Sequence, residues 1–205
     1  MDRDVEPLFL GGDPALDFLN TRFTPPGAVV EVIADGPAFL GWLVQAGLLP
    51  ASHAAKMKRG SDVQSLDALA AEARKLRTWA RAWIERWTAA PGDAYTSELR
   101  RLNALLAGGS SYYELVEGET GLQLVQRAHL DSSSAVIALL AASLARLVSS
   151  ESPELVKRCA GAGCSLWFLD RTKAHRRLFC SAAACGNRAK VAAFRERANA
   201  RAPRS

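Results

Sequence analysis

The sequence is poor in the residues on which catalytic sites most often depend. Its 205 residues include three histidines and four cysteines, and it contains neither a glycine-rich phosphate-binding loop nor an internal repeat. His53 and His129 are isolated in the sequence, and no nucleophile stands at a local spacing from a general base. The sequence therefore predicts a binding protein and not an enzyme.

Long hydrophobic runs are also scarce. The first ten residues contain three acidic residues and no apolar run of the kind that a secretory signal has. The most hydrophobic stretch, residues 135–148, is interrupted by Ser143 and Arg146. It is shorter than the roughly 20 apolar residues that a membrane span needs. These features predict a cytoplasmic protein with no membrane partner.

All four cysteines lie within 27 consecutive positions near the C-terminus. Cys159, Cys164, Cys180 and Cys185 follow the spacing Cys-x4-Cys-x15-Cys-x4-Cys, in which x4 is at the wide edge of the range for zinc sites. Two short chelating loops deliver four thiolates to one tetrahedral ion with little loss of chain entropy. Four protein ligands leave no position for a substrate or water. The spacing therefore predicts one structural zinc ion.

Three other interpretations of the cysteines stay open at this stage. Four unrelated buried cysteines that bind no metal are disfavoured, because all four lie so close together in the sequence. Disulfides conflict with a reducing cytosol, whereas an iron–sulfur cluster uses the same four thiolates and spacing alone separates it poorly from zinc. The segment around the cysteines has few large apolar side chains, so it can hardly fold on its own. Zinc binding, at roughly 10–16 kcal/mol in small fingers, would supply the missing stability.

Positive charge is concentrated in the same segment. Residues 155–205 contain twelve Lys and Arg against Asp170 and Glu196, a net charge of +10, although the whole chain carries +5. Such polarisation predicts a polyanionic partner for this end of the chain. The side chains predicted to contact nucleic acid are Arg171, Lys173, Arg176, Arg177, Arg188, Lys190, Arg195 and Arg197.

The rest of the chain predicts a mostly helical domain. Helices are expected at residues 13–23, 39–44, 66–87, 96–106 and 131–148, a short β-like run at 27–33, and a hairpin around residues 118–121. Residues 149–153 break the last helix, so we expect domains at 1–152 and 153–205. The predicted fold class is α+β, mostly α, with a helical N-terminal domain that carries a small β-hairpin and a small zinc finger after it.

Two segments resemble known families. The cysteine pairs, with Leu166-Trp167-Phe168-Leu169-Asp170-Arg171-Thr172 and Cys185-Gly186-Asn187-Arg188, resemble the CGNR-type zinc finger. Residues 12–22, with Leu16-Asp17-Phe18-Leu19-Asn20-Thr21, resemble the opening of the ABATE domain that commonly precedes such a finger. One departure is Phe179, where family members often have tryptophan. We expect a treble-clef-like finger with a knuckle at 159–164, a hairpin near 166–180 and a helix at about 186–199.

The resemblance also implies a function. It points to a bacterial, stress-induced transcription regulator that binds double-stranded DNA through the finger and responds to a small-molecule effector through the N-terminal domain. Asp17, Asn20, Thr21 and Arg22 are the predicted ligand-binding residues, the alternative being a polar helix end whose side chains bond to the backbone. The alternative function is a zinc ribbon that contacts protein or RNA without reading a DNA sequence.

Overall fold

The computed structural model describes residues 7–24 and 28–201, with side chains as far as Arg197. The fold is α+β and mostly α, as predicted, and the strands of the described residues form three separate two-stranded antiparallel sheets. The chain divides into two compact units, one formed by residues 33–150 and the other by the residues before 33 together with those from 151 onward. The sequence predicts domains that follow chain order, at 1–152 and 153–205, whereas packing groups the N-terminal segment with the C-terminal one.

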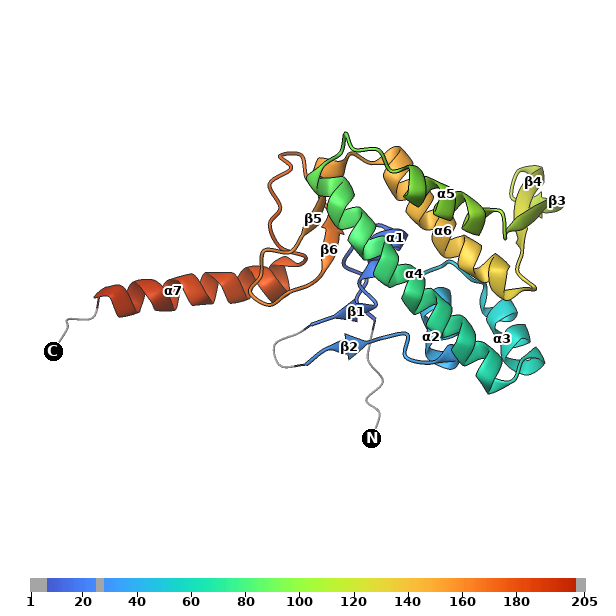
Figure 1. Ribbon diagram of the computed structural model, residues 1–205, viewed down its shortest axis with the longest axis horizontal. Coiled ribbons are helices and arrows are strands. Elements are labelled where there is room, and N and C mark those ends of the chain that lie inside the picture. Colours follow the sequence, from blue (N-terminus) through green and yellow to red (C-terminus); the bar gives the residue numbers. More distant parts are fainter. Residues whose placement is uncertain (1–6, 25–27, 202–205) are drawn as a thin grey trace. The chain divides into compact units, whose positions relative to one another are not determined.

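The unit of residues 33–150 is built from helices and one long hairpin (Figure 1). Its helices are α2 (Gly36–Gln45), α3 (Ala51–Gly60), α4 (Val63–Ala89), α5 (Thr96–Leu106) and α6 (Ser133–Ser150). Aspartate side chains cap two of them: Asp35 accepts from the Ala38 N–H and Asp62 from the Ser65 N–H. The predicted helices at 39–44, 66–87, 96–106 and 131–148 are confirmed, but α3 was missed because its one buried residue, Ala54, gives no apolar stripe.

Helix α6 forms part of the core of this unit. By length and composition it is apolar enough to cross a membrane, but half of it is buried inside the protein. Its buried face includes Leu140, Leu144 and Leu147, and it packs against α4 and α5. Burial of this kind is expected of a central helix that is apolar on most of its surface.

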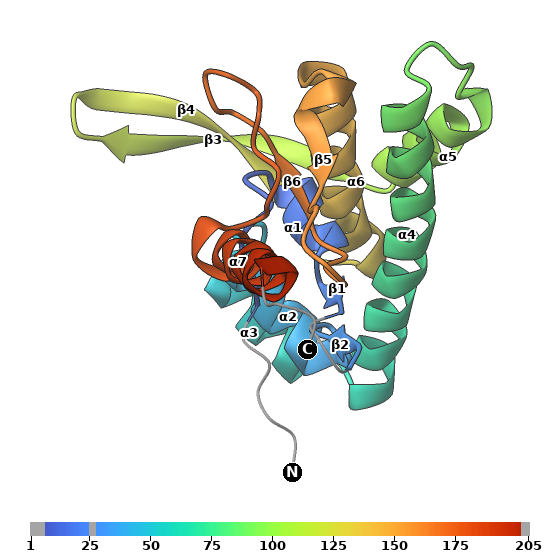
Figure 2. The same ribbon diagram turned by 90° about the vertical axis from the view of Figure 1, so that its left-hand side faces the viewer.

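The predicted hairpin is confirmed as β3 (Ser110–Gly118) and β4 (Gly121–His129). The strands pair in a regular register that places Leu115 opposite Leu124 and closes with Gly118 opposite Gly121. Gly121 has a φ of 123°, which favours glycine at this turn. The hairpin projects from the helices of its own unit in both views (Figures 1 and 2).

The second unit begins with α1 (Pro14–Leu19), followed by β1 (Arg22–Phe23) and β2 (Val30–Glu31). Asp13 caps α1 as predicted, since its carboxylate accepts the Ala15 N–H at 2.8 Å. The prediction that this helix continues to residue 23 is wrong. The backbone turns after Leu19, and Arg22 and Phe23 pair with β2 instead.

The finger continues this unit with η1 (Pro153–Leu155), β5 (Val156–Arg158), β6 (Trp167–Leu169), the π-helical turn η2 (Ala182–Gly186) and α7 (Asn187–Arg201). The helix predicted at about 186–199 is confirmed by α7. The hairpin predicted near 166–180 is wrong, because β6 pairs with β5, which precedes the first cysteine. Residues 170–181 form an irregular loop instead.

Candidate metal centre and nucleic-acid interface

Short backbone elements bring the two cysteine pairs together. Pairing of β5 with β6 folds the first pair into a tight turn, in which the Cys159 N–H donates to the Leu166 carbonyl and the Cys164 N–H to the Gly161 carbonyl, both at 2.9 Å. The second pair is aligned by the Ala160 N–H, which donates to the Leu178 carbonyl at 2.8 Å. A Cβ at Gly161 would lie 3.0 Å from the Cys185 Sγ, closer than an ordinary contact, so a side chain at this position would push against the sulfur site.

The four sulfur atoms have the spacing of a single tetrahedral ion. All four Sγ atoms lie within 4.8 Å of one another, with 3.9 Å between Cys164 and Cys180 and 3.6 Å between Cys180 and Cys185. Zinc–sulfur bonds of about 2.3 Å in a tetrahedron place the sulfurs roughly 3.8 Å apart. A multi-iron cluster holds its thiolates farther apart because they bind different iron atoms. The donor set therefore fits one structural zinc ion, as predicted.

The protein supplies donors to the sulfurs. Cys159 Sγ accepts the N–H groups of Cys180 at 3.3 Å and Gly161 at 3.4 Å, and Cys185 Sγ accepts from the Arg188 guanidinium at 3.0 Å. Four thiolates around a divalent ion carry a net charge of −2, which these donors offset. Arg188, predicted from the sequence as a nucleic-acid contact, thus reaches a metal ligand in the structure.

Burial and these donors act in opposite directions on the thiols. Burial raises the pKa of the Cys164 thiol to about 11, and it raises the pKa of Cys180 well above its ordinary value. Burial also disfavours the Cys159 thiolate, but the backbone N–H groups of Cys180 and Gly161 outweigh it and lower the pKa of Cys159. A bound metal must therefore displace protons from Cys164 and Cys180.

Asp170 organises the loop that carries several of the basic residues. Its carboxylate is fully buried and accepts from Lys157 Nζ at 2.7 Å, Thr172 Oγ1 at 2.6 Å and the Arg177 N–H at 2.9 Å. Burial disfavours the charged carboxylate, but these donors outweigh it and hold the pKa of Asp170 well below its ordinary value. In the sequence, Asp170 stands out only as one of two acids in the basic segment and as a member of the motif 166–172, and its hydrogen bonds were not predicted. The sequence feature that could have indicated this role is its position directly after the apolar run 166–169.

Three of the eight predicted nucleic-acid contacts bond within the protein. Arg171 pairs with Glu151 at 2.7 Å, and Arg188 reaches the Cys185 sulfur. Arg177 donates to the carbonyl groups of Phe179 and Cys180, and its guanidinium lies 4.3 Å from the centre of the Phe168 ring. The other five are exposed and make no hydrogen bond or ion pair with the described residues: Lys173, Arg176, Lys190, Arg195 and Arg197.

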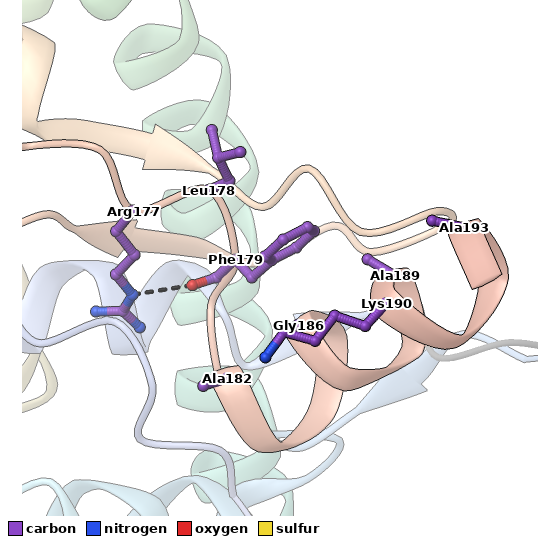
Figure 3. A pocket seen from close by; sticks show the side chains of 8 residues that line it. All are labelled: Arg177, Leu178, Phe179, Ala182, Gly186, Ala189, Lys190 and Ala193. Atoms are coloured by element: carbon purple, nitrogen blue, oxygen red, sulfur yellow. Dashed lines mark hydrogen bonds between the residues drawn. The ribbon is translucent and has the colours of Figure 1, made fainter.

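An apolar hollow adjoins α7 at its first turns. It has a volume of about 490 Å³ and is lined mainly by apolar groups of the loop and the helix (Figure 3). Figure 3 shows Arg177 bonded to the Phe179 carbonyl on one side and Lys190 running back along the helix toward Gly186. Phe194 on α7 and Leu178 on the loop are also exposed, at 67% and 61%. This surface thus combines exposed apolar groups with cations.

Three of the four residues predicted to bind a ligand make hydrogen bonds within the protein, at α1 and the turn that follows it. Asn20 is 1% exposed, and its side-chain amide makes two hydrogen bonds of 2.8 Å, accepting the Trp167 N–H and donating to the Trp167 carbonyl of β6. Thr21 Oγ1 donates to the Phe18 carbonyl, and Asp17 Oδ1 accepts the Gly11 N–H, both at 2.8 Å. Arg22 is exposed on β1. A ligand role for these four residues stays a prediction.

The side chain of Asn20 joins the end of α1 to strand β6 of the finger, so replacing it should lower the stability of the protein. Asn20→Ala leaves the buried N–H and C=O of Trp167 without partners, and each unsatisfied group costs about 1–3 kcal/mol. We expect the free energy of unfolding to fall by roughly 3 kcal/mol in urea titrations of the zinc-loaded protein. Asn103→Ala, at an exposed site on α5, is the matched control and should change little. Equal stability of the two variants would contradict this role.

Asp17 predicts a pH dependence of stability. Burial raises the pKa of its carboxyl from 3.8 to about 6, so the folded protein binds this proton more tightly than the unfolded chain. The contribution of Asp17 to stability therefore falls as the pH rises from about 4 to about 6, and the penalty is fully present above that. Asp17→Asn keeps an acceptor for the Gly11 N–H and removes this titration. We expect the stability of the variant relative to the unmodified protein to increase as the pH rises from about 4 to about 6 and to level off above that in urea titrations, and a pH-independent difference would contradict the prediction.

Comparisons with known families agree with this geometry. The model of the ABATE family, described as "Putative stress-induced transcription regulator", matches residues 12–151. The model of the CGNR zinc finger matches residues 156–198, which include all four cysteines. A comparison with curated proteins gave no match. The two family matches follow one another in the order that the sequence predicts.

Proposed function

Because the chain belongs to the ABATE family and carries a CGNR zinc finger, we propose that it is a zinc-dependent transcription regulator that binds double-stranded DNA. The observation that supports this most directly is the set of five exposed cations on the finger. Both matched families are of regulator or zinc-finger type, which supports a protein that binds and does not catalyse. A regulator of this kind acts in the cytoplasm, at the nucleoid.

The zinc ion would have a structural role. Held by the four cysteines, it would fix the turn after β5, the loop 170–181 and the start of α7 in one arrangement. The chain then provides two groups of phosphate contacts, Lys173 and Arg176 on the loop and Lys190, Arg195 and Arg197 on α7. Phosphate contacts position a protein on a duplex without reading its sequence. Arg188 and Arg177 would support the metal site and the loop instead.

We also propose that the ABATE domain regulates the finger in response to stress, through a small-molecule effector. Asn20 links a residue of the ABATE match directly to the backbone of the finger strand β6. A thermal-shift screen of the full zinc-loaded protein against metabolites and antibiotics would test effector binding. No stabilisation by any compound in such a screen would count against it.

A second function is favoured by one observation. Leu178, Val191 and Phe194 are exposed on the finger, and an apolar hollow adjoins α7. Apolar groups of this kind suit a protein partner or the unstacked bases of RNA better than the backbone of a duplex. In this case the finger would mediate protein or RNA contacts without sequence-specific DNA binding.

One experiment separates the two functions. The zinc-loaded protein is immobilised and offered sheared genomic DNA, and the retained fragments are sequenced, with total RNA offered in parallel. DNA regulation predicts enrichment of a defined set of duplex fragments over the input. Retention of RNA alone, or of DNA without enrichment, would favour the second function.

A further inference from the structure

The hairpin of β3 and β4 leaves an apolar face without cover. No residue of either strand is buried, and only Val116, Gly118 and Val125 are even partly so. The register places four apolar side chains, each 62–69% exposed, on one face of the hairpin: Tyr113, Leu115, Leu122 and Leu124. A two-stranded hairpin is only marginally stable in water without cover for such a face. The apolar face of the hairpin is therefore open to a partner.

The two open edges of the hairpin differ in charge. Among the described residues, β3 and β4 pair only with each other, so the outer edge of each of these two strands is open. Strand β3 carries Glu114 at its centre, and antiparallel pairing of two β3 strands around their midpoint would set this residue against its own copy. Like charges directly opposite each other destabilise a sheet. The central residues of β4, from Leu122 to Gln126, carry no charge.

We propose that β4 pairs in antiparallel fashion with β4 of a second copy, about a two-fold axis near Val125. This pairing joins the hairpins into one four-stranded sheet and brings their apolar faces side by side. Leu124 then lies beside Gln126 of the second copy and Leu122 beside its Ala128, so both leucines gain cover. In this arrangement the two acidic tips, with Glu117 and Glu119, stay apart. Each tip lies beside the end of the other hairpin, where Arg127 pairs with Glu114 of its own hairpin at 2.9 Å.

The β4 edge can be tested with a matched pair of variants. Leu124 and Leu115 are opposite each other on the same face and equally exposed, but only Leu124 lies on the β4 edge. The full zinc-loaded protein is expected to sediment at twice its mass of 22.0 kDa at equilibrium. Leu124→Lys should weaken the dimer about tenfold or more, because the pairing partly buries the new charge, whereas Leu115→Lys should leave it nearly unchanged.

Each outcome decides the proposal. A protein that stays monomeric up to sub-millimolar concentration overturns it. Equal weakening by both variants also overturns it, since that result indicates packing of face against face. If Leu124→Lys fails to fold, as judged by circular dichroism, Gln126→Lys introduces the same charge at an exposed position of the same edge. A dimer unaffected by Gln126→Lys would then overturn the proposal.

Discussion

Replacing Cys180 with serine is expected to abolish stoichiometric zinc binding and to unfold the finger while the unit of residues 33–150 stays folded. The finger has a small core around Leu166 and Phe168, with the cysteines themselves forming much of it. The apolar cluster around the sulfurs is small, so the arrangement of the two cysteine pairs needs another source of stability, and zinc contributes roughly 10–16 kcal/mol in small fingers. Losing one of four thiolates removes most of this free energy. The cysteine variant should therefore have the largest effect of any single substitution in the chain.

Metal analysis and hydrogen exchange measure this effect. The unmodified protein should contain one zinc ion per chain, and the Cys180→Ser variant close to none after dialysis against a weak chelator. The N–H groups of Cys159 and Ala160, which donate to the Leu166 and Leu178 carbonyls within the finger, should lose their protection. Ala183→Ser places the same hydroxyl at an exposed site three residues away and should retain zinc. Full protection in the Cys180→Ser variant would show that zinc does not stabilise the finger.

Removing Lys190, Arg195 and Arg197 of α7 together should produce the largest loss of DNA affinity. Each phosphate contact adds about −0.9 to the slope of log affinity against log salt, which corresponds to nearly tenfold in affinity at about 0.1 M salt. We expect Lys190→Ala, Arg195→Ala and Arg197→Ala in one chain to weaken duplex binding by two to three orders of magnitude at about 0.1 M salt. The slope should become less steep by between two and three. Fluorescence anisotropy at several salt concentrations measures both quantities.

A control with the same change of charge separates local contact from net charge. Lys58, Arg59 and Arg100 are exposed cations of the helical unit, and their triple replacement by alanine removes the same three charges. This control should change the affinity far less and leave the salt slope intact. If both triple variants weaken binding equally, α7 is not the contact surface. Retention of zinc by both variants must be checked, so that loss of the finger is not mistaken for loss of contacts.

The metal ligands could be predicted from the sequence because their signal is local. Two pairs with four residues inside each pair specify the ligands without knowledge of the rest of the fold. The long helix α4 and the hairpin β3–β4 were predictable for the same reason. Hydrophobic residues recur every 3.6 residues in a helix and every 2 residues in a strand, and both patterns can be recognised in a short stretch of sequence. The predicted hairpin at 166–180 failed because β6 pairs with β5 across the knuckle, and the loop after it is held by Asp170 instead of a strand partner.

Contacts between distant segments could not be predicted. Asn20 and Trp167 are 147 positions apart, and nothing in the local sequence of either indicates the two hydrogen bonds that join them. The roles of Arg188 and Arg177 could not be predicted for the same reason. The sequence alone does not distinguish an arginine that bonds to a sulfur or a carbonyl from one that makes no bond within the protein. A count of charges therefore overestimates the surface that is free to bind nucleic acid.

If zinc converts the basic C-terminal segment into a form that binds DNA, the metal should control DNA affinity. The most direct measurement is a titration of labelled duplex DNA with the zinc-loaded protein, the same protein stripped of metal, and the stripped protein after zinc is restored. We expect tight, salt-dependent binding by the loaded protein, its loss on stripping and its recovery with one equivalent of zinc. Equal DNA affinity with and without zinc would contradict it.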